Sequence, residues 1–200
     1  MEAIYLTQRF EMGEASSEHA KDLAEMVVER GGDAAIVSFD DGSYYEVDER
    51  VEVRRVDLPF DGDNLYSWSM MMNNELKRQA RELFDDPELI HAVDWTAIPG
   101  GVALAKHFGA KLAITFQSTE NERGFEGEHA EIISELEWDG AFEADILFAT
   151  NQDTKNSLLF DLDVPGEKLE VVDPFESGWR EDVYKKYSEI IEQEMEVRYS

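Results

Sequence analysis

The sequence predicts a single α/β domain built on a doubly wound, mostly parallel β-sheet. Two observations predict this fold class: β-prone apolar runs alternate with helix-like segments along the chain, and most of those segments are about 10–20 residues long. A helix of that length is what a crossover between parallel strands requires. Hydrophobic residues make up 42% of the 200 residues, which is enough for an ordinary core.

The predicted strands are short runs rich in Ile, Val, Leu and Ala. The runs expected to form the parallel core are 3–7, 34–39, 89–92, 111–116, 146–150 and 168–172. One further stretch, residues 43–56, alternates apolar and polar residues. That alternation predicts a hairpin or an antiparallel pair of strands.

The predicted helices carry apolar residues three and four positions apart. They cover residues 14–31, 64–84, 97–108, 126–143, 152–160 and 180–198. Ser16 or Ser17 is the expected N-cap of the first helix, and Gly31 with Gly32 marks its end.

The last helix is amphipathic, with Val183, Tyr187 and Ile191 along one stripe. Such a stripe needs an apolar surface to cover. The sequence therefore divides into a domain over residues 1–175 and a C-terminal helical segment, residues 176–200, that packs back on it.

The charge is strongly negative. There are 46 acidic and 18 basic residues, which give a formal net charge of −28 and a pI near 4.3. Acidic residues occur in nearly every segment, so the charge does not come from a tail. A protein of a halophilic, high-salt cytoplasm would have such a carboxylate-coated surface; ordinary acidity and mimicry of a nucleic acid are the alternatives. Direct binding of nucleic acid is disfavoured, because phosphate contacts need Lys and Arg.

Self-repulsion at this charge should destabilise the fold when little salt is present to screen it. We expect the melting temperature to rise between about 0.1 M and about 1 M NaCl, where the Debye length falls from about 10 Å to about 3 Å. Thermal unfolding followed by circular dichroism measures this dependence. A melting temperature that does not change with salt would contradict the high-salt interpretation.

Several classes of function are excluded or disfavoured by absences in the sequence. There is no cysteine, so disulfides and thiolate chemistry are excluded. No apolar run approaches the roughly 20 residues of a membrane span, and the N-terminus has no signal-like region. The four histidines lack metal-ligand spacing. We expect a soluble, cytoplasmic protein with no metal and no membrane partner.

Ligands of doubly wound sheets bind beyond the carboxyl ends of the strands. After the predicted strand 89–92 come Asp94 and Trp95, a carboxylate and an indole that could bind sugar hydroxyls and stack on a pyranose ring. An N-cap aspartate beside a packed tryptophan is an equally good interpretation of this pair.

The segment after the predicted strand 111–116 is dense in hydrogen-bonding groups, as recognition of a polyol requires. It runs from Gln117 to Gly124. Behind it, Glu137 lies among apolar residues at helical spacing, so it either points inward and needs a partner or forms a surface salt bridge. The loop after the first strand has only Gly13, so neither a phosphate-binding loop nor a dinucleotide fingerprint is present.

Taken in order, these pieces resemble the N-terminal domain of glycogen and starch synthases, which are retaining glycosyltransferases of the GT-B class. The stretch 91–95, His-Ala-Val-Asp-Trp, resembles the family motif His-Ala-His-Asp-Trp. Residues 115–124 resemble its Thr-[hydrophobic]-His-Ser-Thr-Glu-x-x-Arg-Gly loop. The pieces 137–138, 143–145 and 168–172 match the elements that follow.

The resemblance implies a Rossmann-like domain on the acceptor side of a cleft, with hexosyl transfer from a nucleotide sugar to a glucan, without a metal or cofactor. Asp94 and Gln117 are the candidates for catalytic residues. The residues that the resemblance assigns to substrate binding are His91, Asp94, Trp95, Gln117, Ser118, Thr119, Glu120 and Arg123. In the complete family fold the last helix crosses back onto this domain, and residues 180–198 are the candidate for it.

The sequence also departs from the family pattern. Val93 replaces the second histidine of the motif, and Gln117 replaces the histidine that would contact the transferred sugar. Glutamine can hydrogen-bond a hydroxyl but cannot carry a proton as imidazolium does. Residues 11–14 replace a Lys-x-Gly-Gly loop, and no donor-binding domain is found in these 200 residues.

Three hypotheses follow. The chain is half of a glycosyltransferase completed by a separate donor-binding domain or paralogue, or a non-catalytic carbohydrate-binding or regulatory module, or an α/β domain with an unrelated ligand.

Overall fold

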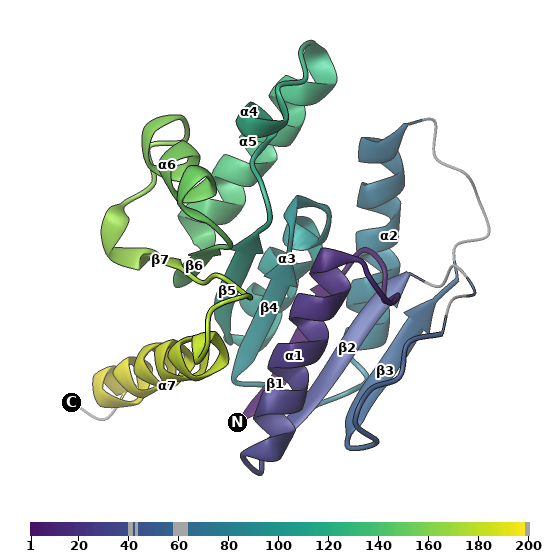
Figure 1. The fold of residues 1–200 in the computed structure, drawn as a ribbon. Helices are drawn as coiled ribbons and strands as arrows, with labels where there is room; N and C mark the ends of the chain where they lie inside the picture. The colour runs from purple at the N-terminus through teal and green to yellow at the C-terminus, as the bar shows by residue number, and fades with distance from the viewer. Residues whose placement is uncertain (40–41, 43, 58–63, 199–200) are drawn as a thin grey trace.

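The fold is a seven-stranded sheet in which every pair of neighbouring strands is parallel (Figure 1). The computed structural model describes residues 1–39, 42, 44–57 and 64–198. The strand order is β3-β2-β1-β4-β5-β6-β7. The strands are β1 (Glu2–Thr7), β2 (Asp33–Phe39), β3 (Val51–Val56), β4 (Leu89–Val93), β5 (Lys111–Phe116), β6 (Ile146–Ala149) and β7 (Leu169–Val171). The predicted α/β fold class is confirmed.

Helices cover both faces of the sheet (Figure 1). One face packs against α2 (Leu65–Ala80), α3 (Ile98–Phe108), α5 (Glu128–Glu143) and α6 (Gln152–Phe160). The other packs against α1 (Ala15–Glu29) and α7 (Trp179–Arg198). Short turns of helix complete the chain: η1 (Trp95–Ala97), α4 (Glu120–Arg123) and η2 (Gly166–Lys168). Within the described ranges, none of these helices has the length and apolar character to cross a membrane.

The central strands are buried on both faces, which explains why they read as continuous apolar runs rather than alternating ones. In β1, Ile4 and Leu6 belong to the core under α2 and α3, while Ala3 and Tyr5 belong to the core under α1 and α7. All four are fully buried.

The prediction of an antiparallel pair over residues 43–56 is wrong. Residues 51–56 form β3, which pairs parallel to β2, and residues 44–50 are not strand; residue 43 lies outside the described residues. Tyr45 is buried in the core under α1, and Val47 packs against that core. The alternation therefore reflects one-sided packing of an irregular segment on α1. A turn at Asp48, whose carbonyl accepts from Val51 N at 2.9 Å, leads into the strand.

The start of α1 also differs from the prediction. Its N-cap is Glu14, whose carboxylate accepts from the backbone N–H of Ser17 at 2.6 Å and from the Ser17 hydroxyl at 2.7 Å. The predicted cap by Ser16 or Ser17 is wrong. Ser17 Oγ instead binds the preceding loop, donating to Arg9 O at 2.8 Å. The end of the helix agrees with the prediction, since Gly31 follows it at a φ of 81°.

α7 packs on the sheet as its amphipathic pattern predicts. Val183 and Tyr187 are fully buried, and Trp179 is 8% exposed. Tyr187 Oη lies 2.5 Å from Nδ1 of His91 on β4. The ring of His19 on α1 stacks on Trp179 at 5.0 Å between ring centroids. This helix therefore closes the sheet face that α1 leaves open.

Candidate functional site

The strand order changes direction between β1 and β4, because β2 and β3 extend the sheet on one side of β1 and the later strands extend it on the other. In an open α/β sheet, the loops after two such strands diverge and leave a crevice at their carboxyl ends. The loops that follow β1, β4 and β5 lie at this carboxyl edge of the sheet. They contain residues 8–14, 94–97 and 117–119.

Asp94 is held in an unusual backbone conformation directly after β4. Its φ is 66° and its ψ is 164°, a region that residues other than glycine rarely occupy and that costs about 1–3 kcal/mol. Its N–H donates to Thr115 O on β5 at 2.8 Å, which fixes the turn. Its side chain makes no capping hydrogen bond to η1. The alternative interpretation is therefore correct in position, since Asp94 is the N-cap residue of η1 and Trp95 is packed in the core, but the Asp94 side chain does not cap the helix.

Besides the hydroxyl oxygens of Thr7 and Thr96, two polar atoms at this edge are buried without a hydrogen-bond partner: Oδ1 of Asp94 and Nε2 of Gln117. One is an acceptor and the other is a donor. A buried polar atom without a partner costs about 1–3 kcal/mol, and a hydrogen bond to each of these atoms would recover that cost. This pair is the main chemical feature of the site.

Burial raises the pKa of Asp94 from its ordinary value of 3.8 to about 6. Arg123 and the backbone amides of Trp95 and Gln117 act in the opposite direction, and the nearby charge of Glu14 raises the pKa further. Above about pH 6 the carboxylate is ionised and accepts hydrogen bonds only.

Arg123 is anchored on three sides. Its Nε donates to Glu120 Oε2 at 2.8 Å, its Nη2 to Glu137 Oε1 at 2.6 Å, and its Nη1 to Ser118 O at 3.0 Å. Both Glu137 oxygens also accept from the backbone N–H of Glu120, at 2.9 and 3.1 Å. The cation is therefore shared between two carboxylates of the protein itself.

Glu137 is fully buried, so the inward-pointing interpretation is correct and the surface salt bridge is not found. Burial raises the pKa of Glu137 to about 7, although the Glu120 N–H and Arg123 act to lower it. Its partner Arg123 lies on α4, a short helix where the sequence predicts a loop. The signal for that helix was present in Thr119 and Glu122, which form a capping box.

The structure separates the predicted substrate-binding residues into two groups. Asp94, Gln117, Ser118 and Arg123 lie at the carboxyl edge and are partly exposed. The others are buried: His91 lies beneath α7, Trp95 packs into the core under α2 and α3, Thr119 Oγ1 pairs with Ser157 Oγ at 2.6 Å, and Glu120 is 4% exposed.

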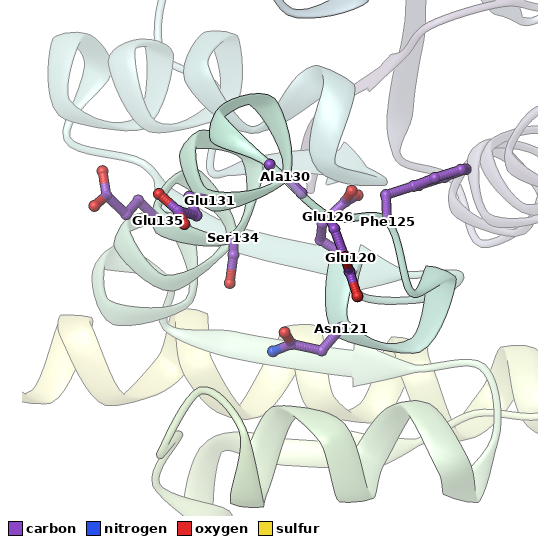
Figure 2. Close-up of a pocket in the computed structure, with 9 residues that line it drawn as sticks. Glu120, Asn121, Phe125, Glu126, Ala130, Glu131, Ser134 and Glu135 are labelled. Atoms are coloured by element: carbon purple, nitrogen blue, oxygen red, sulfur yellow. The ribbon is translucent and has the colours of Figure 1, made fainter.

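Two features of the edge are not among the predicted site residues. Glu14 lies in the loop after β1 and was not expected, because Ser, Thr, Asp and Asn are the usual N-caps. The second feature is a depression of about 520 Å³ between α4 and α5. Figure 2 shows Glu131 and Glu135 on the α5 side of it and Phe125 at its other end. Four carboxylates line this depression, those of Glu120, Glu126, Glu131 and Glu135. It is therefore unsuited to an anion.

Across the described part of the chain, no group of three or more His, Cys, Asp and Glu side chains could hold a metal ion. The chemistry that the edge offers is hydrogen bonding by one carboxylate and one amide, next to an internally paired guanidinium.

The fold is shared with solved glycosyltransferase structures. A sucrose-phosphate synthase structure from Thermosynechococcus elongatus matches with a TM-score of 0.67 and 12% identity, over 98% of this chain and 99% of that one. A longer structure of the same enzyme matches with a TM-score of 0.70 and 14% identity, over 86% of this chain and 47% of that one. Anabaena HepE in complex with UDP and glucose gives a TM-score of 0.58 and 17% identity, over 86% of this chain and 44% of that one. The chain thus spans less than half of these two longer structures.

No curated protein sequence matches the chain significantly. The family model of Glycosyltransferase Family 4, in contrast, matches residues 16–175, which is most of the sequence and includes β2 to β7 with the loops after β4 and β5. The chain belongs to Glycosyltransferase Family 4.

Proposed function

We propose that this domain binds a saccharide acceptor as the acceptor-side half of a GT-B glycosyltransferase, in which a hexosyl group passes from a nucleotide sugar to a hydroxyl of a glucan. The donor would be held by a separate domain or paralogue. The observation that carries the proposal is the buried, unpartnered pair of Asp94 Oδ1 and Gln117 Nε2 at the carboxyl edge. A sugar ring with adjacent hydroxyls offers both a donor and an acceptor to such a pair.

Two findings from the comparisons support this proposal. Among the similar structures, Anabaena HepE is a complex with UDP and glucose, and Arabidopsis thaliana UGT89C1 is a complex with UDP-L-rhamnose. The match to the shorter sucrose-phosphate synthase structure covers 98% of this chain and must therefore include α7. We infer that α7 corresponds to the helix that crosses back onto the N-terminal domain in complete members of the fold.

A non-catalytic carbohydrate-binding or regulatory module is the second candidate. Gln117 favours it, because an amide can bind a sugar hydroxyl but cannot carry a proton during transfer. Both candidates place the acceptor against Asp94. They differ in whether turnover appears when a donor-binding partner is added.

Calorimetric titration in molar salt with glucose nucleotides and with maltooligosaccharides tests the proposal. Acceptor binding without donor binding is the expected result. Binding of neither ligand would contradict both candidates and favour an unrelated ligand.

Asp94→Asn should weaken acceptor binding about 10- to 100-fold, because a hydrogen bond to a charged group contributes about 1.5–3 kcal/mol. Wild-type affinity should also rise as the pH passes about 6, where Asp94 ionises and becomes a better acceptor for a sugar hydroxyl. Titration calorimetry across this pH range measures both effects.

Asp163→Asn is the matched control, since exposed Asp163 also has a positive φ, of 52°, but lies far along the chain in another loop. This control should bind like wild type. Unchanged acceptor affinity in Asp94→Asn would remove Asp94 from the binding site.

A further inference from the structure

We propose that Glu14 is a specificity residue that makes the site take uncharged sugars and reject phosphorylated ones. This inference rests on the proposed function, because it concerns which acceptors the same edge accepts. It is carried by the placement of Glu14 at the N-terminus of α1, beside the loop that holds Asp94.

The N-terminus of a helix is normally favourable for an external anion, because its first N–H groups are unpaired and its dipole is positive. In α1, which has 15 residues, the side chain of Glu14 already occupies this position. The Glu14 carboxylate accepts from Ser17 N at 2.6 Å and from Ser17 Oγ at 2.7 Å. The protein thus supplies its own anion where a phosphate group would otherwise bind.

Independent evidence that a ligand binds beside this carboxylate comes from the neighbouring strands. β1 and β4 are adjacent, with Leu6 opposite Ala92, so the loops with Glu14 and Asp94 leave the same place on the sheet. The negative charge of Glu14 acts on Asp94 and contributes to raising the pKa of the Asp94 carboxyl group. Asp94 Oδ1 and Gln117 Nε2 have no partners in the protein. An acceptor bound to them would face two carboxylates.

The cations near this edge are already paired. Arg123 is bound to Glu120 and Glu137, and Arg9 Nη1 lies 3.5 Å from Glu11 Oε1. Arg55 has one buried nitrogen, Nη1, without a hydrogen-bond partner. It stands on β3, however, two strands beyond β1, and its Nη2 is held by Phe10 O at 2.8 Å. Arg55 is therefore one cation near the loop after β1 that could still bind a phosphate.

The test compares maltose with maltose 1-phosphate by calorimetry on the full chain, at the lowest salt concentration that keeps it folded. For wild type, we expect the phosphorylated sugar to bind at least about 10-fold more weakly, because two partly buried carboxylates repel a dianion at an effective dielectric constant of about 20. The ratio of the dissociation constants for maltose 1-phosphate and maltose should fall about 10-fold in Glu14→Gln. Glutamine keeps an oxygen for Ser17 N but loses the negative charge. Glu82→Gln is the control: it removes the same charge from an exposed position between α2 and β4, at the opposite edge of the sheet, and should leave the ratio unchanged.

Three calorimetric outcomes would overturn the inference: equal or tighter binding of maltose 1-phosphate by wild type, a ratio that Glu14→Gln does not change, or a loss of phosphate-sugar binding in Arg55→Gln.

A second measurement does not depend on sugar binding and so separates failure of this inference from failure of the proposed function. Inorganic phosphate should shift the amide resonances of residues 15–17 in Glu14→Ala, which removes the cap from Ser17 N, but not in wild type. Equal shifts in both proteins would overturn the role of Glu14 even if neither sugar binds.

Discussion

Deletion of residues 178–200 should abolish the cooperative unfolding transition. The deletion removes α7, whose Val183 and Tyr187 are fully buried and whose Trp179 is nearly so. Each such side chain contributes about 1.5–3 kcal/mol of burial, and the partly buried residues of the helix add to this. The sum is close to the total free energy of unfolding of a typical domain, which is about 5–15 kcal/mol. Differential scanning calorimetry and near-ultraviolet circular dichroism measure the loss of the transition.

The reason for so large an effect lies beneath the helix. Tyr5, His91 and Phe148 are all fully buried on the face that α7 covers. Removal of the helix would expose their rings and would leave His91 Nδ1 without the Tyr187 hydroxyl.

Two point variants serve as controls for this deletion. Tyr187→Phe keeps the ring and should cost about 1–3 kcal/mol, because it leaves the buried His91 Nδ1 without a hydrogen-bond partner. Lys185→Ala, at a side chain that is 74% exposed, should change stability by less than about 0.5 kcal/mol. An unchanged melting temperature and solubility after the deletion would show that α7 is not part of the folded unit.

Arg123→Met should destabilise the protein by about 3–5 kcal/mol at alkaline pH, because it leaves the Glu137 carboxylate buried without its cation. The effect should depend on pH with a definite sign. Burial already raises the pKa of Glu137 to about 7, and loss of Arg123 raises it further. A raised carboxyl pKa gives stability that is fully present below the pKa of the unfolded chain and is lost as pH rises through the folded-state pKa.

Urea unfolding from about pH 7 to about pH 9 separates the two proteins. In wild type, titration of Glu137 should change the free energy of unfolding little over this range. In Arg123→Met, the free energy of unfolding should fall by up to about 1.4 kcal/mol per pH unit. Adding Glu137→Gln to Arg123→Met should remove that slope, because glutamine does not titrate. A variant within about 1 kcal/mol of wild type, with no slope, would contradict the buried ion pair.

The sequence was sufficient to predict the α/β class, the core strands and most helices, because β-prone runs and helical spacing both report burial directly. The prediction of strands failed at residues 44–50, where apolar side chains are buried although the backbone is not a strand. These residues alternate because Tyr45 and Val47 pack on the core under α1. The Glu14 cap was missed because local preference favours serine, whereas the structure uses Ser17 as the donor.

The candidate site could also be predicted only in part from the sequence. Position after a strand was enough to single out Asp94 and Gln117. It could not show that Oδ1 and Nε2 of these residues lack partners, because that depends on how the surrounding elements pack. The family resemblance also assigned His91 and Trp95 to substrate binding, although their side chains lie in the core. Sequence order alone does not say which way a side chain at the end of a buried strand points.

The most direct test of the acceptor site is amide chemical-shift mapping with a maltooligosaccharide in molar salt. Our account predicts that the shifts concentrate at residues 94–97 and 117–123 and disappear in Asp94→Asn. An alternative location is the exposed, stacked pair of Trp138 and Phe142 on α5, whose ring centroids lie 5.8 Å apart. Shifts confined to that pair, or no shifts at either place, would contradict the assignment of the carboxyl edge of β4 and β5 as the acceptor site.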